Sequence, residues 1–128
     1  MIVIDASAAV AILLGEKSRE ELIKKLSAST EHTMSPISYA ELVMALARTY
    51  SQPKAAADTF LAETRISIGT IDQEQSRFAV HAFLFYGKGR HPARLNLGDC
   101  FSYAAAKALN APLLYVGDDF SKTDIRTA

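Results

Sequence analysis

The sequence predicts an α/β protein built around a short, mainly parallel central sheet. Short apolar runs alternate with longer segments of helical periodicity along the whole chain, which is the pattern of successive β-α units. No repeat, low-complexity tract or linker interrupts its 128 residues, a length typical of one domain. We therefore expect residues 1–128 to fold as a single domain.

The first half of the chain supplies two strand signals and three helix signals. A strand over Ile2–Ile4 is indicated by a β-branched apolar run, and the helix after it has Ser7 as its candidate cap. A charged and apolar repeat predicts a helix over 18–28. A short strand over 33–35 ends at Pro36, and apolar residues at helical spacing predict a helix over 38–50.

The second half continues the same alternation. Pro53 opens a helix over 53–64, and Ile66–Ile68 is the next strand. Asp72 caps a helix that reaches Tyr86 and turns Phe78, Ala82 and Phe85 inward. A polar loop over 87–95 follows, and then a helix from Asn96 to about Leu109. The last elements expected are a strand over Pro112–Val116 and a turn from Gly117. Thr123–Arg126 is too short to assign beyond a candidate edge strand.

Composition and charge limit the functions that such a chain can perform. The hydrophobic fraction of 49% is typical of a globular protein. Lys plus Arg and Asp plus Glu both number 14, so no net charge attracts nucleic acid or membrane over long range. Asp5 interrupts the apolar N-terminal run, which argues against a signal peptide or a membrane span, and the lone Cys100 excludes an internal disulfide. We expect a cytoplasmic protein without membrane contact.

Acidic residues gather at one predicted edge of the sheet. Asp5 ends the first strand, while Asp118 and Asp119 follow the last one. Glu41 and Asp99 are placed in the first turns of two predicted helices. The carboxyl ends of parallel strands and the helix starts that follow them share one edge, where ligands bind in such folds.

A cluster of carboxylates at that edge points to a divalent cation. Two carboxylates 4 Å apart repel by about 1 kcal/mol in water and by about 4 kcal/mol at an effective dielectric of about 20. Such groups either raise one another's pKa or bind a cation. Mg²⁺ and Mn²⁺ prefer oxygen ligands, and a cation so held can activate water and stabilise the leaving oxygen of a phosphodiester.

Each acid also has a structural interpretation. Glu41 stands three residues after Ser38, the spacing of a capping box. Asp99 favours the positive end of a helix, and the pair after Gly117 fits an ordinary turn. Asp5 is the acid least readily explained as structural, because it ends a buried strand, and the four positions together favour a site.

Several segments resemble the PIN-domain ribonucleases, and more narrowly the VapC toxins of VapBC toxin–antitoxin pairs. The resemblance extends over essentially the whole chain and is carried by MIVIDASAAVAILLGE, YAEL, YGKGRHPARLNLGDCFSYA and LNLGDCFSYAAAKALNAPLLYVGDDFSKTDI. It implies a three-layer α/β/α sandwich and an Mg²⁺- or Mn²⁺-dependent endoribonuclease that cuts structured RNA, such as transfer or ribosomal RNA, to 5′-phosphate and 3′-hydroxyl ends. It also implies a homodimer that a small VapB-type antitoxin silences by occluding the acidic site.

The resemblance also assigns roles to individual positions. Asp5, Glu41 and Asp99 fall on the first three acids of the family. We expect Asp5 and Asp99 to be the primary metal ligands, while Glu41 and the fourth acid bind the metal directly or through water. The fourth acid stays open, because GDDF offers both Asp118 and Asp119.

Four further residues are candidates for contact with the RNA. Ser7 stands two residues after Asp5, where its hydroxyl can bond a carboxylate or the scissile phosphate, although it can equally cap a helix. Lys88, Arg90 and Arg94 make up the only dense basic stretch, together with His91, and can contact phosphates or simply face solvent.

Two rival functions compete with the toxin hypothesis. A PIN-type nuclease of RNA processing, or one acting on DNA flaps, would share the scaffold, although the small size without insertions favours the toxin form. A receiver-like interaction domain would also collect acids at strand ends. Receivers need a Lys after the last strand, whereas PLLYV is followed here by GDD.

Overall fold

The computed structural model describes all 128 residues and contains one four-stranded sheet. The strands lie in the order β3-β2-β1-β4, and every neighbouring pair is parallel. Their bounds are β1 Ile2–Ile4, β2 His32–Met34, β3 Ile66–Ile68 and β4 Leu113–Leu114. The predicted α/β class with a parallel central sheet is therefore confirmed.

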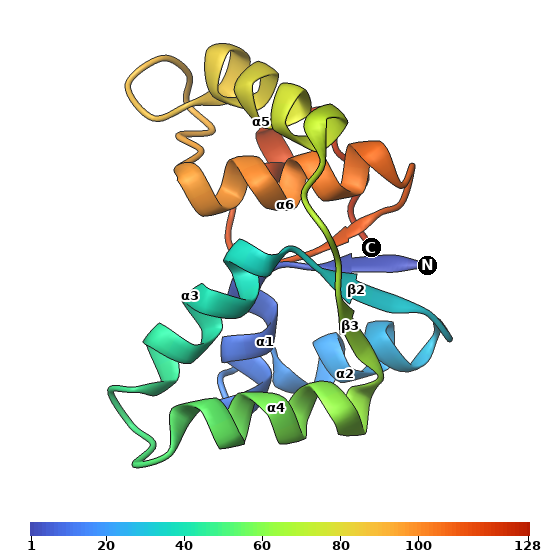
Figure 1. The fold of residues 1–128 in the computed structure, drawn as a ribbon, viewed down its shortest axis with the longest axis vertical. Coiled ribbons are helices and arrows are strands. Elements are labelled where there is room, and N and C mark those ends of the chain that lie inside the picture. Colours follow the sequence, from blue (N-terminus) through green and yellow to red (C-terminus); the bar gives the residue numbers. More distant parts are fainter.

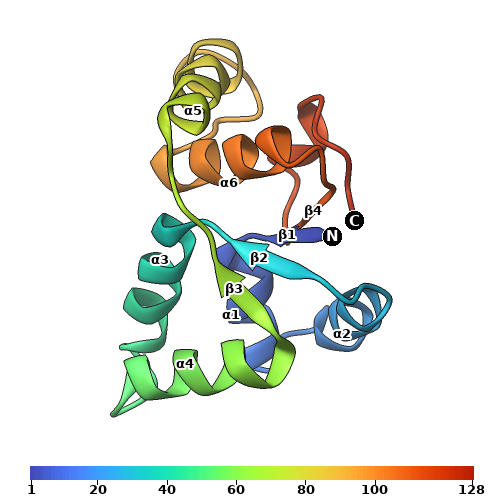
Figure 2. The ribbon, with the colours of Figure 1, turned by 45° about the vertical axis from the view of Figure 1, so that its right-hand side comes forward.

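Helices cover both faces of this sheet (Figure 1). Helices α1 to α4 lie on one side and α5 with α6 on the other, which gives three layers; the turned view of Figure 2 shows the same division. The helices, with a short 3₁₀ turn η1 near the C-terminus, are α1 Ala6–Leu13, α2 Arg19–Ser27, α3 Pro36–Leu46, α4 Pro53–Thr64, α5 Gln73–Tyr86, α6 Leu97–Ala108 and η1 Phe120–Lys122.

The alternation of strand side chains divides the interior into two apolar cores. Ile2 and Ile4 of β1 pack with α1 to α4, whereas Val3 between them packs with α5 and α6. Leu114 and Leu113 of β4 divide in the same way. Each such buried side chain contributes about 1.5–3 kcal/mol to folding, so both layers depend on the period-two pattern of the short strands.

Two helices begin earlier than the sequence predicted. Ser7 is not the cap of α1, because the Asp5 carboxylate takes that role and accepts a hydrogen bond from the Ser7 backbone N–H. Ser38 does not cap α3 either, since Ser35 is the N-cap and Pro36 occupies the first turn. The predicted capping box of Ser38 and Glu41 is therefore wrong, and Glu41 lies in the second turn of α3.

Other predicted boundaries also shift. Helix α3 ends at Leu46, and Tyr50 beyond it uses its hydroxyl to bond the Leu13 carbonyl at 3.2 Å. Only Leu113–Leu114 of the segment Pro112–Val116 forms a strand. No strand forms over Thr123–Arg126, although Thr127 makes an isolated bridge to β4.

The prediction that Phe85 faces inward is wrong. Phe85 is 60% exposed, because α5 covers the sheet only through α6 and the outer side of α5 stays open.

The helices of this fold are too short or too polar for any of them to span a membrane.

The strand directions bring the ends of β1, β2 and β4 to one edge. The backbone N–H of Asp5 donates to the Leu114 carbonyl at 2.9 Å, which ties the end of β1 to the end of β4. Helix α3 starts two residues after β2 ends, at the same edge. The expected meeting of strand ends and helix starts is therefore present.

Candidate active site

Three of the predicted acids line one cleft at this edge. Asp5, Glu41 and Asp99 border a cleft of about 390 Å³, together with Ser7. They come from the end of β1, from α3 and from the first turn of α6. Segments far apart in the sequence thus deliver their carboxylates to one place, as the parallel topology requires.

Asp5 is the most firmly held of these acids. Its side chain is only 4% exposed and caps α1. The Oδ2 atom accepts hydrogen bonds from the Ser7 N–H at 3.0 Å and from the Ser7 hydroxyl at 2.6 Å. The Oδ1 atom accepts a hydrogen bond from the Ser102 hydroxyl at 2.5 Å. Hydrogen bonds to both oxygens compensate for the burial of a charged group.

Asp99 combines a structural and an electrostatic role. It forms a capping box with Asn96, whose backbone N–H donates to the Asp99 carboxylate at 3.1 Å. Burial raises the pKa of Asp99 to about 6, against the hydrogen bond from the Asn96 backbone, which lowers it. The negative charges of Asp5, Asp119 and Glu41 raise this pKa further. The carboxylate of Asp99 therefore stands in an electronegative, partly desolvated place.

Glu41 belongs to the same electrostatic group. Burial, and after it the charge of Asp5, raises the pKa of Glu41 above its ordinary value. The Glu41 carboxylate lies directly against Gly98, where a Cβ atom would collide with both carboxylate oxygens. A glycine at position 98 thus lets the start of α6 approach Glu41. The sequence analysis missed this residue, although a glycine inside a helix, directly before a candidate ligand, signals close approach.

The two adjacent aspartates after Gly117 differ in their surroundings. Asp119 is half-buried, and its charge acts on Asp99. Asp118 is exposed, its carbonyl accepts a hydrogen bond from Ser121, and it is absent from the charges that act on Asp99. Neither side chain lines the cleft, and of the two only Asp119 is close enough for its charge to raise the pKa of Asp99.

The cleft also contains a carboxylate that the sequence analysis missed. Glu16 lines it, although it follows the end of α1 rather than the end of a strand. Gly15 before it adopts a left-handed φ of +65°, which turns the chain back at the end of the helix. No pattern in the sequence predicts that this turn faces the acids.

Of the residues predicted to contact RNA, Ser7 lines the acidic cleft, whereas the basic residues of the 87–95 loop do not. The Ser7 hydroxyl bonds Asp5 and also accepts a hydrogen bond from the Val116 N–H at 3.0 Å, so the predicted contact with a carboxylate is present. Arg90 donates to the Leu84 carbonyl at 3.2 Å and lies 5.6 Å from the Phe83 ring.

The other two basic residues are exposed. Lys88 borders an apolar groove with Phe83, while Arg94 has a left-handed φ of 52°.

The donor chemistry of the cleft fits a hard divalent cation. Its charged side chains are all carboxylates, whose oxygens Mg²⁺ and Mn²⁺ prefer as ligands. No three His, Cys, Asp or Glu side chains converge closely enough to enclose an ion by themselves. Such a cation would therefore keep several of its waters, as Mg²⁺ commonly does when one or two carboxylates hold it.

No thiol, imidazole or amine side chain lines the cleft, and its one hydroxyl, that of Ser7, is bonded to Asp5 and to the Val116 N–H. Burial raises the pKa of Cys100 to about 11, so its thiol stays protonated. His32 lies outside the cleft, with its ring nitrogens 2.8 Å from the carbonyls of Thr64 and Leu26. The arrangement supports cation-assisted hydrolysis rather than covalent catalysis by a side chain.

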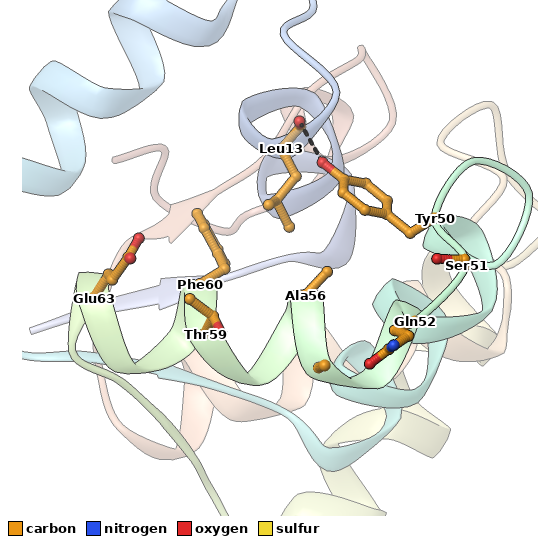
Figure 3. A pocket seen from close by; sticks show the side chains of 9 residues that line it. Leu13, Tyr50, Ser51, Gln52, Ala56, Thr59, Phe60 and Glu63 are labelled. Carbon is orange, nitrogen blue, oxygen red and sulfur yellow. Dashed lines mark hydrogen bonds between the residues drawn. The ribbon is translucent and has the colours of Figure 1, made fainter.

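A separate cavity of about 430 Å³ lies between the end of α1 and α4 (Figure 3). Tyr50, Phe60 and Leu13 point into it, and the hydrogen bond from Tyr50 to Leu13 crosses its edge. Glu63 is its only charged lining residue. It therefore offers no cluster of groups for catalysis, in contrast to the acidic cleft.

Comparison with known proteins agrees with this geometry. Residues 2–126 match the family model of the PIN domain. The chain is 42% identical to Ribonuclease VapC42 of Mycobacterium tuberculosis over 129 residues, which cover 98% of each chain. It is 40% identical to Ribonuclease VapC of Mycolicibacterium smegmatis over 124 residues, which cover 96% of each.

A solved structure resembles the fold over its whole length. The crystal structure of Mycobacterium tuberculosis VapC20, a Sarcin-Ricin loop cleaving toxin, superposes with a TM-score of 0.78 at 18% identity and covers 100% of this chain and 98% of that one. At this identity the likeness shows a shared fold.

Proposed function

The chain belongs to the PIN domain family, among its VapC ribonucleases, and on this premise we propose that it is the toxin of a toxin–antitoxin pair, an endoribonuclease that depends on a divalent cation. The observation that carries the proposal is the electrostatic coupling of the cleft. Burial and neighbouring carboxylates raise the pKa of both Glu41 and Asp99. A cation that binds between such groups removes the cost of their repulsion.

The chain's own residues define how the reaction proceeds. Asp5 and Asp99 would be the primary ligands of the cation, and Glu41 and Asp119 would bind it directly or through water. When bound, Mg²⁺ or Mn²⁺ supplies a Lewis acid and a water of lowered pKa for attack on the phosphorus. Asp5 is already oriented by its hydrogen bonds, so it needs little reorganisation on binding. Asp119, rather than Asp118, is the fourth acid, because its charge acts on Asp99.

The proposed substrate is structured RNA, such as transfer or ribosomal RNA. The family likeness supports it, and the solved VapC20 toxin is described as cleaving the Sarcin-Ricin loop. In this proposal the exposed side chains of Lys88 and Arg94 contact phosphates of the RNA. The guanidinium of Arg90, which lies over the Phe83 ring, does so as well. Ser7 also lines the cleft, and because its hydroxyl proton is donated to Asp5, its part in the proposed site is to orient that carboxylate.

Two protein partners complete the proposal. A small VapB-type antitoxin covers the acidic cleft; a toxin–antitoxin complex from Klebsiella pneumoniae shares this fold with a TM-score of 0.73 at 21% identity over 97% of this chain and 93% of that one. A second copy of the chain covers the apolar side of α5. Val80 and Leu84 of α5 are 59% and 50% exposed, and Leu97 at the start of α6 is 70% exposed. Val80 and Leu97 line a groove of about 560 Å³ between the two helices. Sedimentation equilibrium of the purified chain tests the dimer.

The direct test is RNA cleavage by purified chain that is free of antitoxin. Total RNA and transfer RNA are incubated with Mg²⁺, with Mn²⁺ and with EDTA, beside the variants Asp99→Asn and Glu74→Gln. Glu74 is an exposed acid on α5 outside the cleft, so its variant removes a negative charge without touching the site. We expect discrete fragments that require metal, persist in Glu74→Gln and vanish in Asp99→Asn. Equal cleavage by Asp99→Asn would refute the site.

A further inference from the structure

Two serines lie directly beneath the acidic cleft, and the proposed reaction gives them no role. Ser102 of α6 and Ser38 of α3 are both fully buried, at 0% exposure. A buried hydroxyl destabilises a protein unless it is hydrogen-bonded. Ser102 bonds the Asp5 Oδ1 atom at 2.5 Å, and the two serine hydroxyls are 3.0 Å apart. These contacts join α3, α6 and the end of β1.

The direction of these hydrogen bonds follows from their chemistry. An ionised carboxylate only accepts hydrogen bonds, so the single hydroxyl proton of Ser102 goes to Asp5. The Ser102 oxygen must then accept from Ser38, whose proton points toward Ser102. The chain of bonds therefore runs one way, from Ser38 to Ser102 to Asp5. Each bond in such a chain strengthens the next.

Only one oxygen of Asp5 has an acceptor site left for a ligand. A carboxylate offers about two acceptor sites on each oxygen. Both sites of Oδ2 are taken by the N–H and hydroxyl of Ser7. Oδ1 accepts one hydrogen bond, from Ser102, and so keeps one site. The oxygen that Ser102 orients is thus the one that remains open.

The spacing of the serines places them on the same helix faces as the acids. Ser102 follows Asp99 by three residues on α6, and Ser38 precedes Glu41 by three residues on α3. Residues three apart on a helix are neighbours on its surface. Each helix therefore presents one carboxylate at the cleft and one hydroxyl below it.

We propose that Ser102 is a positioning residue for the cation site, and that Ser38 acts through it. Ser102 holds the Oδ1 atom of Asp5 in the orientation in which its open site faces the cation, while Ser38 fixes the direction of the Ser102 proton. This inference rests on the proposed function, because it needs Asp5 to be a ligand. Groups that orient metal ligands in this way typically change metal affinity by about 10–100-fold when they are removed.

The test measures Mn²⁺ binding apart from catalysis. Free and bound Mn²⁺ are counted by electron paramagnetic resonance for wild type, Ser102→Ala, Ser38→Ala and the double variant. Ser76→Ala on α5 is the matched control, since Ser76 is exposed and bonds only the Asp72 carbonyl. Circular dichroism and thermal unfolding in EDTA check the fold of each variant.

We expect a graded loss of affinity. Ser102→Ala weakens Mn²⁺ binding by about 10-fold or more, and Ser38→Ala weakens it less, because the bond from Ser102 to Asp5 remains. The double variant matches Ser102→Ala, since Ser38 acts only through Ser102. RNA cleavage by Ser102→Ala requires more Mn²⁺ but approaches the wild-type kcat when Mn²⁺ is saturating.

Other outcomes overturn the inference. Wild-type Mn²⁺ affinity in Ser102→Ala, with only a changed unfolding temperature, would make the serines purely structural. Should Ser102→Ala fail to fold, Ser38→Ala decides, and wild-type affinity in it refutes the directed chain. If the wild type binds Mn²⁺ and cleaves RNA, and Ser102→Ala does both equally well, this inference alone is refuted. A folded wild type that neither binds Mn²⁺ nor cleaves refutes the proposed function, and the inference with it.

Discussion

Replacing Asp99 by Asn should stabilise the protein when no metal is present. The folded protein binds a proton at Asp99 more tightly than the unfolded chain does, because the pKa rises from 3.8 to about 6. Such a raised carboxyl pKa means that stability falls as the pH rises through the window between about pH 4 and pH 6. At pH 7 the charged carboxylate therefore destabilises the fold, whereas the neutral amide of the Asp99→Asn variant carries no such penalty.

The size of this effect follows from the pKa shift. A shift of about two units corresponds to about 3 kcal/mol at most. Asp99 is partly exposed, so solvent screening reduces the expected gain to about 1–2 kcal/mol. An Asn side chain can still accept the hydrogen bond from the Asn96 N–H through its carbonyl oxygen, so the cap of α6 is kept.

Thermal and urea unfolding in EDTA at pH 7 and at pH 4.5 measure this prediction. We expect Asp99→Asn to be more stable than wild type at pH 7 and the gap to narrow at pH 4.5, where the wild-type carboxyl is protonated. Mn²⁺ should then raise the unfolding temperature of wild type more than that of the variant. The control is Asp72→Asn, at the exposed cap of α5, for which no gain at pH 7 is expected. A destabilised Asp99→Asn, or a gap that is independent of pH, would refute the reasoning.

Three further predictions follow from the contacts. Gly98→Ala forces the Glu41 carboxylate aside, so we expect RNA cleavage to fall by about 10-fold or more while urea unfolding changes by less than about 1 kcal/mol, since Ala favours the helix. Asp119→Asn should lower cleavage and Mn²⁺ affinity more than Asp118→Asn, and equal effects would contradict the proposed fourth acid. Leu42→Ala, in the fully buried core of α3, should destabilise the fold by about 2–5 kcal/mol in urea unfolding, far more than any change in the cleft.

The sequence predicted the order of strands and helices because hydrophobic periodicity reflects which residues are buried. The run Ile2–Ile4 alternates between two cores, and the apolar repeat of α6 faces inward, so the order of strands and helices could be predicted. Helix starts were less certain, since Ser35 and Ser38 offer similar caps and only the geometry of the chain around Pro36 selects the first. Asp5 took the cap expected of Ser7 because its extended backbone, directly before Ala6, lets its carboxylate accept from the Ser7 N–H.

The position of the main acids was also predictable from the sequence. Strands that run parallel end at one edge, so Asp5 and the helices that carry Glu41 and Asp99 had to meet there. The identities of these residues and the direction of the chain are enough for this conclusion, without any knowledge of side-chain distances.

Only the tertiary structure decided the finer arrangement. Ser102 and Asp5 are 97 positions apart, and their hydrogen bond exists because α6 packs over the end of β1. The tight docking of α6 likewise brings Gly98 against Glu41, and the turn after β4 lets the charge of Asp119, rather than that of Asp118, act on Asp99. Local patterns fix which face of an element is buried, whereas contacts of a few ångströms between elements depend on how the helices dock across the sheet, which no local pattern records.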